Sequence, residues 1–524
     1  MDALLTESAT RLADRLRRRE LRARDLLEVH IAHIQRENPA LNAMVVDRFD
    51  LARAEADAAD RRLATGDLDP AREPLLGVPC SIKECFALTG MPQTSGLVAR
   101  KGLVADRDAE AVRRVRAAGA IPMGVTNVSE LCMWMESNNK VYGRSSNPYD
   151  PTRIVGGSSG GEGALVGAGG SPFGIGSDVG GSIRMPAFFN GVFGHKPTGG
   201  LVTNAGQYPN SSGVGLRYVT TGPLVRRAED LMPLLRILAA GRAPGDSADP
   251  GAGLGPGGEA ALTLGDERSV DLRGLSVLDV EDNGVTEVSS ELRAAQRRAA
   301  EHLASRGARV RQTRIPGLKR SLELWGAMLS SAGGEPFREL LANGEQVSWA
   351  RELLRFALSP RRSPYTLPAI VLALVERVPE LASGRAERAI AAGLELQGEL
   401  TRAIGDGIML YPSYSEPAPR HNAPLWPPFN WVYTAVLNVM ELPVTQVPLG
   451  LSGEGLPLGV QVAASHGGDH RTIAVALELE RAFGGWVPPP RIVARSKLAS
   501  TSTSTSTSTS TSTSTSTNGR TARP

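Results

Sequence analysis

The chain has 524 residues, of which 41% are apolar and 22% are charged, and its formal net charge is +3. These values are ordinary for a soluble globular protein, and the charge is too small to indicate a protein that binds nucleic acid. Three cysteines in so long a chain do not suggest a disulfide framework and fit a reducing compartment. Residues 1–20 lack the apolar core of a signal peptide, and no apolar run reaches the ~20 residues of a membrane span. We therefore expect a cytoplasmic protein.

The first 65 residues predict three helices that pack on the outside of a sheet. Thr6 or Ser8 can cap the first, whose leucines share one face. The second starts near Asp25 and stops at Asn38-Pro39, and the third covers residues 51–63. We expect no chemistry in them.

The seven histidines are scattered and give no metal-binding pattern. His30 and His33 have helical i, i+3 spacing, but no acidic or thiol partner is near them, so a solvated helix face is the preferred interpretation. His466 and His470, in the segment HGGDH, are weaker candidates because the glycines indicate a loop. We expect neither a metal ion nor a cofactor.

The segment Gly77-Val78-Pro79 predicts the entry to a strand, and Lys83 follows it among apolar neighbours. An amine in apolar surroundings loses hydration, which makes a neutral base near pH 7 feasible. A lone lysine in such a place more often extends its ammonium group to water. Beyond it, residues 109–119 predict a helix and residues 120–125 a strand, an alternation typical of βαβ units.

Residues 156–200 are unusually rich in glycine and contain two serine-bearing clusters, GGSSGG and GSDVGGSIR. Glycine allows φ > 0 and lets backbone N–H groups approach a ligand closely. A serine is a weak nucleophile until a base and an oxyanion pocket surround it, and two serines on such turns fit that role. A single cluster would more often be a structural turn or a phosphate cradle. Neither cluster, however, has the Gly-Lys-Ser/Thr ending of a phosphate loop.

The remainder of the chain continues the alternation of helices and strands. Helices are expected at residues 229–240, 291–306 and 474–482, and strands at 275–284, 308–310, 408–412 and in a hairpin-like pair at 442–462. Glycine and proline dominate residues 241–267, which predict a surface loop. Residues 496–524 form a tail dominated by a Ser-Thr repeat, which should be disordered because the repeat has no apolar side chains to bury.

Residues 319–380 are mostly helical by pattern and carry apolar patches, with Arg361 and Arg362 between two of them. Core packing explains such patches most simply. The alternative is a basic, apolar cap that touches lipid.

Three segments together resemble the amidase signature family, whose members are hydrolases with a Ser–Ser–Lys triad. They are GVPCSIK with Lys83, GGSSGG with Ser158, and GGSIR with Ser182, in the family's order and with the serines 24 positions apart (182 − 158). The resemblance covers about residues 4–488. It implies a single α/β domain over residues 1–495, in which helices cover both faces of a central mixed sheet. Many relatives carry Asp after the lysine, whereas this chain has Glu84.

The resemblance also implies a role for each residue of the site. Ser182 would attack the amide carbonyl, and Ser158, after a cis peptide at Gly157, would relay protons to a neutral Lys83. The implied oxyanion donors are the N–H groups of Val179, Gly180, Gly181 and Ser182. Asp178 and Arg184 would brace this loop, and Cys132 and Met133 would line the substrate pocket. For Cys132, a plain buried small residue is the alternative.

Within the family, the segments VGGSSGGEG, MPAFFNG and TNVSELCMW look most like fatty-acid amide hydrolases of the second type. Those carry an N-terminal membrane anchor, and no anchor-like segment is recognisable here, so membrane residence is not expected. The implied substrate is a small amide with an apolar or fatty acyl chain. Cys132, Met133, Trp134, Phe188, Phe189 and the apolar helices between Trp325 and Val378 are candidates for the wall of its channel.

Other functions remain open from the sequence. An amidotransferase subunit that passes ammonia to a partner shares the triad, and a short-chain or aryl amidase would need only a small pocket. A non-catalytic module that binds an anion on the glycine clusters is a third class. Peripheral membrane contact and a homodimer are both compatible with the sequence.

Overall fold

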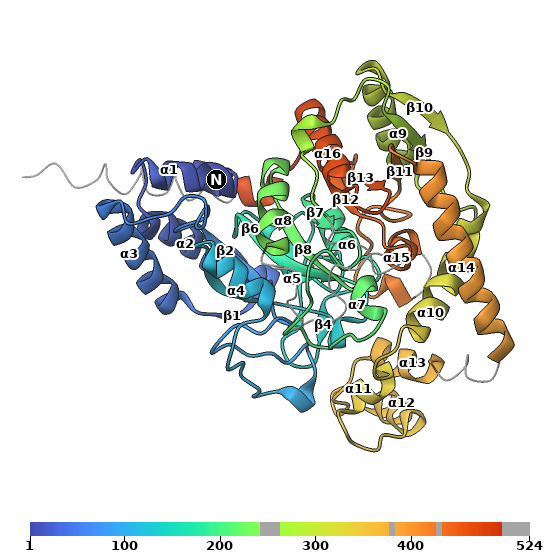
Figure 1. The fold of residues 1–524 in the computed structure, drawn as a ribbon. Helices are drawn as coiled ribbons and strands as arrows, with labels where there is room; N and C mark the ends of the chain where they lie inside the picture. Colours follow the sequence, from blue (N-terminus) through green and yellow to red (C-terminus); the bar gives the residue numbers. More distant parts are fainter. Residues whose placement is uncertain (241–262, 377–382, 426–431, 495–524) are drawn as a thin grey trace, which may run out of the picture.

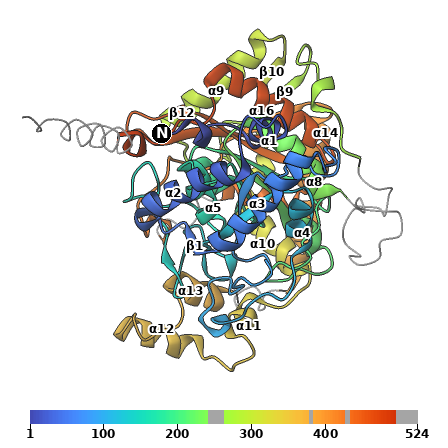
Figure 2. The same ribbon diagram turned by 90° about the vertical axis from the view of Figure 1, so that its left-hand side faces the viewer.

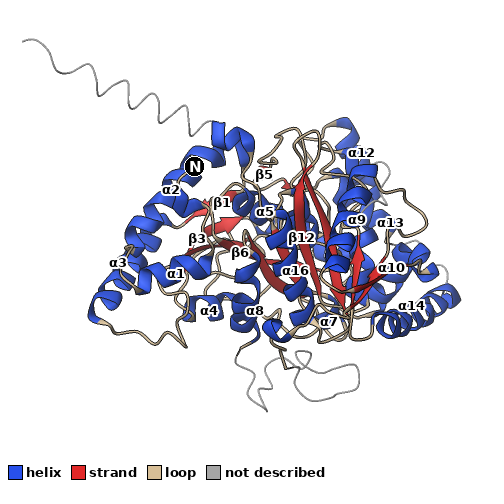
Figure 3. Ribbon diagram, turned by 90° about the horizontal axis from the view of Figure 1, so that it is seen from above, coloured by secondary structure: helices blue, strands red, loops and turns tan. Residues whose placement is uncertain are grey.

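The fold is built on one large mixed sheet with helices on both of its faces (Figures 1 and 3). The computed structural model describes residues 1–240, 263–376, 383–425 and 432–494. Eleven strands form the sheet in the order β1-β3-β2-β6-β8-β7-β12-β13-β11-β9-β10. A single α/β domain with a central mixed sheet is what the sequence predicted.

The sheet is parallel in two places and antiparallel elsewhere. β2 runs parallel to β3 and β6, and β9 runs parallel to β10 and β11. The strands are β1 (Met44–Asp47), β2 (Pro79–Lys83), β3 (Ile121–Thr126), β6 (Phe173–Asp178), β7 (Phe193–Lys196), β8 (Thr220–Val225), β9 (Ser276–Asp279), β10 (Arg309–Gln312), β11 (Ile408–Tyr411), β12 (Val444–Leu451) and β13 (Pro457–Ala464). β4 (Asn138–Asn139) and β5 (Gly143–Arg144) form a separate pair.

Where the sequence indicated bounds, the helices agree with them within a few residues, except that α16 begins five residues earlier than expected; α14 was not predicted. They are α1 (Ala9–Arg17), α2 (Ala23–Leu41), α3 (Phe49–Thr65), α4 (Glu110–Ala117), α5 (Gly160–Gly167), α6 (Arg184–Phe189), α7 (Gly215–Tyr218), α8 (Leu231–Ala239), α9 (Ser290–Ser305), α10 (Ser321–Ser331), α11 (Phe337–Ala342), α12 (Trp349–Leu358), α13 (Leu367–Val375), α14 (Ser383–Ile404), α15 (Val432–Val439) and α16 (Asp469–Phe483). The predicted tail at 496–524 lies outside the described residues, as does most of the predicted loop at 241–267.

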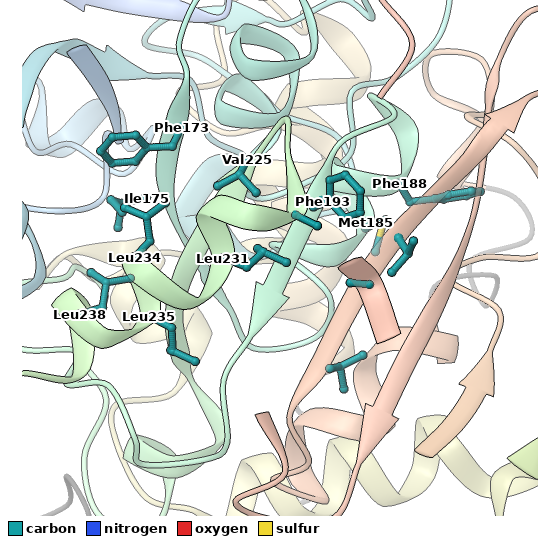
Figure 4. Packing of buried hydrophobic residues seen from close by; sticks show 14 of the residues in the cluster. Phe173, Ile175, Met185, Phe188, Phe193, Val225, Leu231, Leu234, Leu235 and Leu238 are labelled. Carbon is teal, nitrogen blue, oxygen red and sulfur yellow. The ribbon is translucent and has the colours of Figure 1, made fainter. Parts of the chain in front are cut away.

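The central strand β6 shows how the sequence places helices on the two faces. Its large side chains, Phe173 and Ile175, point to one face and pack with the leucines of α8 (Figure 4). Its glycines point to the other face, where α5 lies. A Cβ on Gly174 would stand 1.8 Å from Oε2 of Glu162 in α5. Alternation with period two therefore sets one face for packing and the other for close approach of α5.

The N-terminal helices pack beside the β1 end of the sheet (Figures 1 and 2). Ser8 caps α1, as one of the two expected candidates, by accepting a hydrogen bond from the Arg11 N–H. The prediction that α2 stops at Asn38-Pro39 is wrong, because the helix continues to Leu41. Proline there removes one hydrogen bond of the last turn, and the Asn38 side chain accepts the N–H groups of the two residues after Asn42.

The prediction of a solvated face for His30 and His33 is also wrong. Both side chains are buried, and they hydrogen bond to the carbonyl oxygens of Gly170 and Ala168 at 3.0 and 2.8 Å. Burial lowers the pKa of His30 to about 3, so it is neutral. The two imidazoles thus bond to the carbonyl groups that follow α5. These partners lie about 140 positions further along the chain, so the local spacing of the histidines gives no sign of the contact.

Helices α11, α12 and α13 lie on one side of the molecule, away from the sheet (Figures 1 and 2). They have a hydrophobic cluster of their own, which includes Trp349, Tyr365 and Ile370 together with Leu131. The apolar patches of α11, α12 and α13 therefore pack as a small satellite core, whereas α10 packs Leu324 and Met328 into the main core. Several large apolar side chains of α12 and α13 remain exposed: Leu354, Leu358, Val371 and Val375.

Candidate active site

The carboxyl ends of adjacent parallel strands meet at one edge of the sheet, the usual place for a site in α/β folds. β2 ends at Lys83 and β6 ends at Asp178, and the two strands pair in parallel at Ile82 and Ile175. Ser182 lies on the turn that follows β6. Ser158 lies just before α5, the helix packed on the glycine face of β6. The three residues of the predicted triad thus come from three separate segments.

Lys83 is completely buried and points at a cluster of hydroxyl groups. Its Nζ donates hydrogen bonds to Ser158 Oγ at 2.7 Å and to Ser177 Oγ at 2.9 Å, with Ser177 O at 3.4 Å. Among the described residues, no carboxylate lies within ion-pair distance of this amine. Ser177 is a site residue that the sequence analysis missed, and its position in the segment GIGSD beside the strand end was the only signal for it.

The chain around Ser158 leaves no room for side chains on its glycines. The Gly157–Ser158 peptide bond is cis. A Cβ on Gly157 would stand 2.0 Å from the carbonyl oxygen of Trp134. Ser137 Oγ donates to Ser158 O at 3.3 Å, and the Ser159 N–H donates to the carbonyl of Ser182 at 3.1 Å. The last bond ties the two serine-bearing turns together.

The Ser182 turn is held by three side chains. Asp178 accepts the N–H groups of Gly181 at 2.7 Å and Ile183 at 3.0 Å. Thr434 and Trp325 hold the outer side of the turn. Thr434 Oγ1 donates to Gly180 O at 2.7 Å, and the Trp325 indole N–H donates to Val179 O at 2.9 Å.

These contacts leave particular backbone N–H groups available. Within the part of the chain that the structure describes, the N–H groups of Val179, Gly180 and Ser182 donate to no protein acceptor. Here the structure differs from the expectation, because the N–H of Gly181 is already engaged by Asp178. Gly181 instead allows the turn to form, because its φ of +118° disfavours any residue with a side chain. It also lets Thr434 approach, since a Cβ at this position would stand 2.1 Å from Thr434 Oγ1.

Asp178 and Arg184 form a fully buried ion pair beneath this turn. Arg184 Nε and Nη2 each donate to the Asp178 carboxylate at 3.0 Å. Burial opposes ionisation of Asp178, but the charge and hydrogen bonds of Arg184 outweigh it and hold the pKa of the carboxyl well below its usual range. Arg184 also donates to Asn438 Oδ1 at 2.6 Å and to Gln461 Oε1 at 2.7 Å.

Asn438 and Gln461 are further residues that the sequence analysis missed. Both are buried, and they lie more than 250 positions from Arg184 in sequence. Gln461 could have been found from the sequence, because it is a polar residue in the middle of the apolar strand β13 and a buried polar side chain needs a hydrogen-bond partner.

The predicted pocket residues lie at different depths. Cys132 is 8% exposed and belongs to the main hydrophobic core. Met133 and Trp134 are half-buried. Phe188 and Phe189 belong to the main core, where the Phe189 ring meets Tyr414 at 5.2 Å. The last two residues therefore pack the fold and do not offer surface to a ligand.

Two buried carboxylic acids close to Lys83 accept hydrogen bonds from hydroxyl and backbone N–H groups. Glu162 accepts from Ser81 Oγ at 2.5 Å and from Thr126 Oγ1 at 2.8 Å, and burial raises its pKa to about 8. Glu84 accepts the N–H groups of Thr94 and Ser95, and burial raises its pKa to about 7. Both groups connect β2 to its neighbours without forming an ion pair with the lysine.

The described residues contain no group of three or more His, Cys, Asp or Glu that could hold a metal ion. In the same residues, no helix combines the length and the apolar character needed to cross a membrane.

Comparison with known proteins assigns this fold and site to a class. The sequence profile of a family described as Amidase matches residues 25–473. Fatty-acid amide hydrolase 2-A of Danio rerio is 47% identical over 502 residues, covering 93% of this chain and 90% of the relative. Fatty-acid amide hydrolase 2 of Homo sapiens is 44% identical over 504 residues, covering 93% and 91%. The solved structure of 6-aminohexanoate cyclic dimer hydrolase is 27% identical, with a TM-score of 0.72, and covers 94% of this chain and 100% of that chain.

The chain therefore belongs to the amidase signature family, and it is an amide hydrolase. Within the family it is close to fatty-acid amide hydrolase 2, to which it is 44–47% identical over most of its length. The resemblance recognised in the sequence is confirmed.

Proposed function

We propose that the protein hydrolyses the carbon–nitrogen bond of linear amides through an acyl-enzyme on Ser182, with Ser158 as proton relay and Lys83 as base. The observation that supports this most directly is the 2.7 Å hydrogen bond between Lys83 Nζ and Ser158 Oγ in a site closed to water. An amine held away from water and from carboxylates is suited to act as a base. The hydrogen bond from Ser159 to Ser182 keeps the two serines on neighbouring turns.

In the first half-reaction, Ser182 Oγ attacks the carbonyl carbon of the amide. Its proton passes to Ser158 Oγ as the proton of Ser158 moves to Lys83 Nζ. The carbonyl oxygen becomes an oxyanion, and we propose that it is received by the free N–H groups of Val179, Gly180 and Ser182. Lys83 then returns its proton through Ser158 to the leaving nitrogen, and the C–N bond breaks.

In the second half-reaction, water repeats the attack on the acyl-enzyme. The water gives its proton to the same relay, and the ester bond to Ser182 breaks as its Oγ is reprotonated. The fixed pair of Asp178 and Arg184 keeps the turn in place through both steps, since Asp178 holds the N–H groups of Gly181 and Ile183. These two residues are positioning residues that support the oxyanion pocket.

We propose an apolar acyl chain as the preferred substrate portion. Two observations support it. Trp325 of α10 lies against the Ser182 turn, where its ring is 3.4 Å from the position of a Cβ on Gly180. Half-buried Met133 and Trp134 lie on the segment that also carries Cys132. The similarity to fatty-acid amide hydrolase 2 agrees with this choice.

A short-chain or aryl amidase is the second candidate, and one observation favours it. Phe188 and Phe189, which the sequence suggested as part of the channel wall, are buried in the main hydrophobic core and do not line a channel. An amidotransferase subunit would share the triad but would need partner subunits, so turnover by the protein alone would argue against it.

A series of acyl anilides from acetyl to decanoyl tests the proposal, after fluorophosphonate labelling has shown that Ser182 reacts. Each methylene moved from water into an apolar channel gains ~0.8 kcal/mol, so we expect kcat/KM to rise about fourfold per carbon until the channel is full. Trp325→Ala should flatten the rise, whereas Trp349→Ala, in the satellite core, should keep the slope. Flat or falling kcat/KM in the unmodified protein would replace the fatty-amide proposal by a short-chain or aryl amidase.

Two further parts of the proposal concern the surroundings of the enzyme. The exposed Leu354, Leu358, Val371 and Val375 support transient contact of α12 and α13 with a membrane surface. Binding to phospholipid vesicles, compared with a Leu354→Ser/Leu358→Ser variant, tests this. A cytoplasmic location, a homodimer and the division into a domain at 1–495 and a tail at 496–524 stay predictions from the sequence.

A further inference from the structure

Residues 127–137 connect the proposed catalytic site to the satellite core, and the reaction above uses no group from the middle of this segment. Both ends of the segment are bonded to the chain around Ser158. At the first end, the Gly161 N–H donates to Asn127 O at 3.1 Å. At the second end, Ser137 Oγ donates to Ser158 O at 3.3 Å. The two ends are therefore held at the Ser158 turn.

The middle of the segment contacts α13, which lies with α11 and α12 away from the sheet (Figure 1). Glu130 is 2% exposed, and its Oε2 accepts the N–H of Thr366 at 2.8 Å and the hydroxyl of the same residue at 2.7 Å. Thr366 is the N-cap of α13. Leu131 is fully buried in the satellite core, together with Tyr365 and Ile370. One carboxyl group and one leucine thus fasten the segment to the satellite core.

The backbone turns sharply at this contact. Leu131 and Cys132 have φ of +49° and +58°, a conformation that two consecutive non-glycine residues keep only where the surroundings enforce it. The Leu131 N–H donates to Ser95 O at 2.8 Å, and the Cys132 side chain packs in the main core. Half-buried Met133 and Trp134 follow directly. The strained turn is therefore held between two separate cores, and it leads into the residues proposed for the acyl side of the site.

We propose that Glu130 is a positioning residue for the acyl chain of the substrate: it fastens the segment to α13 and thereby places Met133 and Trp134, without itself touching substrate or Ser182. This role rests on the proposed function, in which these two side chains lie on the acyl side of the site. The hydrogen bonds between Glu130 and Thr366 do not depend on that function.

The contact requires an acceptor oxygen at this place and does not require a negative charge. Oε2 of Glu130 accepts both hydrogen bonds, whereas its buried Oε1 meets no hydrogen-bond partner among the described residues. Burial raises the pKa of Glu130 to about 7, so the neutral acid is already populated at neutral pH. A glutamine offers the same oxygen and a neutral group in place of Oε1, and it should preserve the contact. A leucine would leave both donors of Thr366 without an acceptor.

Loss of the contact should weaken binding of long acyl chains and spare the chemistry at Ser182. The ends of the segment keep their bonds at the Ser158 turn, but the strained turn in the middle loses its polar anchor. A displacement of about 1 Å in a group that positions substrate costs on the order of 100-fold. For Glu130→Leu we therefore expect kcat/KM on a decanoyl anilide to fall on the order of 10- to 100-fold. Most of the fall should appear as a higher KM, and an acetyl anilide should be affected little.

The experiment has three readouts on the full-length protein. They are kcat and KM on acetyl and decanoyl anilides, the rate of fluorophosphonate labelling at Ser182, and hydrogen exchange of peptides from residues 127–137. Glu130→Leu should raise KM on the decanoyl anilide, keep the labelling rate and speed up exchange in the segment. Glu130→Gln should behave as the unmodified protein in all three. Leu131→Ala removes the apolar anchor and should act in the direction of Glu130→Leu, which gives a second test if that variant does not fold.

Glu352→Leu is the matched control. Glu352 is a second buried carboxyl group of these helices, and its side chain bonds to Ser363 Oγ at 2.6 Å and to Arg355 at 3.2 Å, both within residues 349–363. This variant removes a buried carboxyl group from the helices without removing a bond to the segment. We expect unchanged exchange of residues 127–137 and an unchanged KM on the decanoyl anilide. An equal rise of KM in Glu352→Leu would assign the effect to the stability of the helices and would overturn the role of Glu130.

Other outcomes also decide the matter. An unchanged KM on the decanoyl anilide in Glu130→Leu, or a rise that Glu130→Gln shares, would overturn the proposal. A fall in kcat with slower fluorophosphonate labelling would overturn it too, because Glu130 would then act on the catalytic residues. If the unmodified protein shows no preference for long chains, the role in acyl positioning is refuted. If it hydrolyses no amide at all, the proposed function fails, and hydrogen exchange still judges whether Glu130 fastens the segment to α13.

Discussion

Lys83 and Ser158 should fail together, because the proposed path of the proton runs through both. We consider Lys83→Met, which keeps the aliphatic length and removes the amine, and Ser158→Ala, alone and combined. The amine is joined to Ser158 Oγ by a hydrogen bond of 2.7 Å, and in the proposed mechanism it reaches Ser182 only through that hydroxyl. Removal of either group therefore interrupts the same relay.

The size of the effect follows from this arrangement. Loss of one member of a serine triad costs on the order of 10⁴-fold in turnover, which corresponds to about 5 kcal/mol of transition-state stabilisation. Two independent losses would multiply to about 10⁸-fold. Because the two residues act as one unit, we expect the double variant to lose no more than about tenfold beyond either single variant.

The assay is kcat/KM on a chromogenic acyl anilide at pH 7, together with the rate of fluorophosphonate labelling at Ser182. Lys101→Met is the control, since Lys101 is exposed and should keep full activity. Circular dichroism and thermal unfolding show whether each variant folds. Near-normal activity of Lys83→Met would refute the assignment of the base. A double variant whose loss equals the product of the single losses would refute the shared relay.

Two further predictions concern stability. The pKa of Glu162 is about 8 in the folded protein, above its unfolded value of about 4.3. Between these pH values the folded state keeps a proton that the unfolded state loses. The free energy of unfolding therefore falls as pH rises through this range, by up to about 1.4 kcal/mol per pH unit. Glu162→Gln lacks this term, and its stability relative to the unmodified protein should grow from about pH 5 to about pH 8 in urea unfolding; parallel curves would contradict the burial argument. Gly174→Ala places a Cβ 1.8 Å from Glu162 Oε2. We expect this overpacking to lower the free energy of unfolding by about 1–3 kcal/mol or more. Gly326→Ala is the control, because Gly326 lies in the interior of α10 and a Cβ there meets nothing within 4 Å. Its free energy of unfolding should rise by about 0.5–1 kcal/mol. Equal urea midpoints for Gly174→Ala and Gly326→Ala would show that packing is not the cause.

The sequence predicted the fold class and the majority of the elements, because their signals are local. Glycine C-caps, hydrophobic period and serine caps act within a few residues, and Gly66 and Ser8 do what those rules expect. Burial of histidine is not a local property. His30 and His33 have the spacing of a surface pair, yet α5 and the residues after it cover both of them.

The candidate site divides in the same way. The sequence by itself determined which residues carry hydroxyl, amine and thiol groups, and the glycines that let two serine turns exist are visible in the motifs. The family resemblance implied that Lys83 and Ser158 meet, and the structure shows the hydrogen bond between them. Only the tertiary structure decided that Asp178 engages the N–H of Gly181 and that Asn438 and Gln461 complete the partners of Arg184. It also assigned Phe188 and Phe189 to the core. The physical reason is distance along the chain: a buried polar group takes whichever partner the packing of remote strands and helices brings to it, and no local pattern specifies that partner.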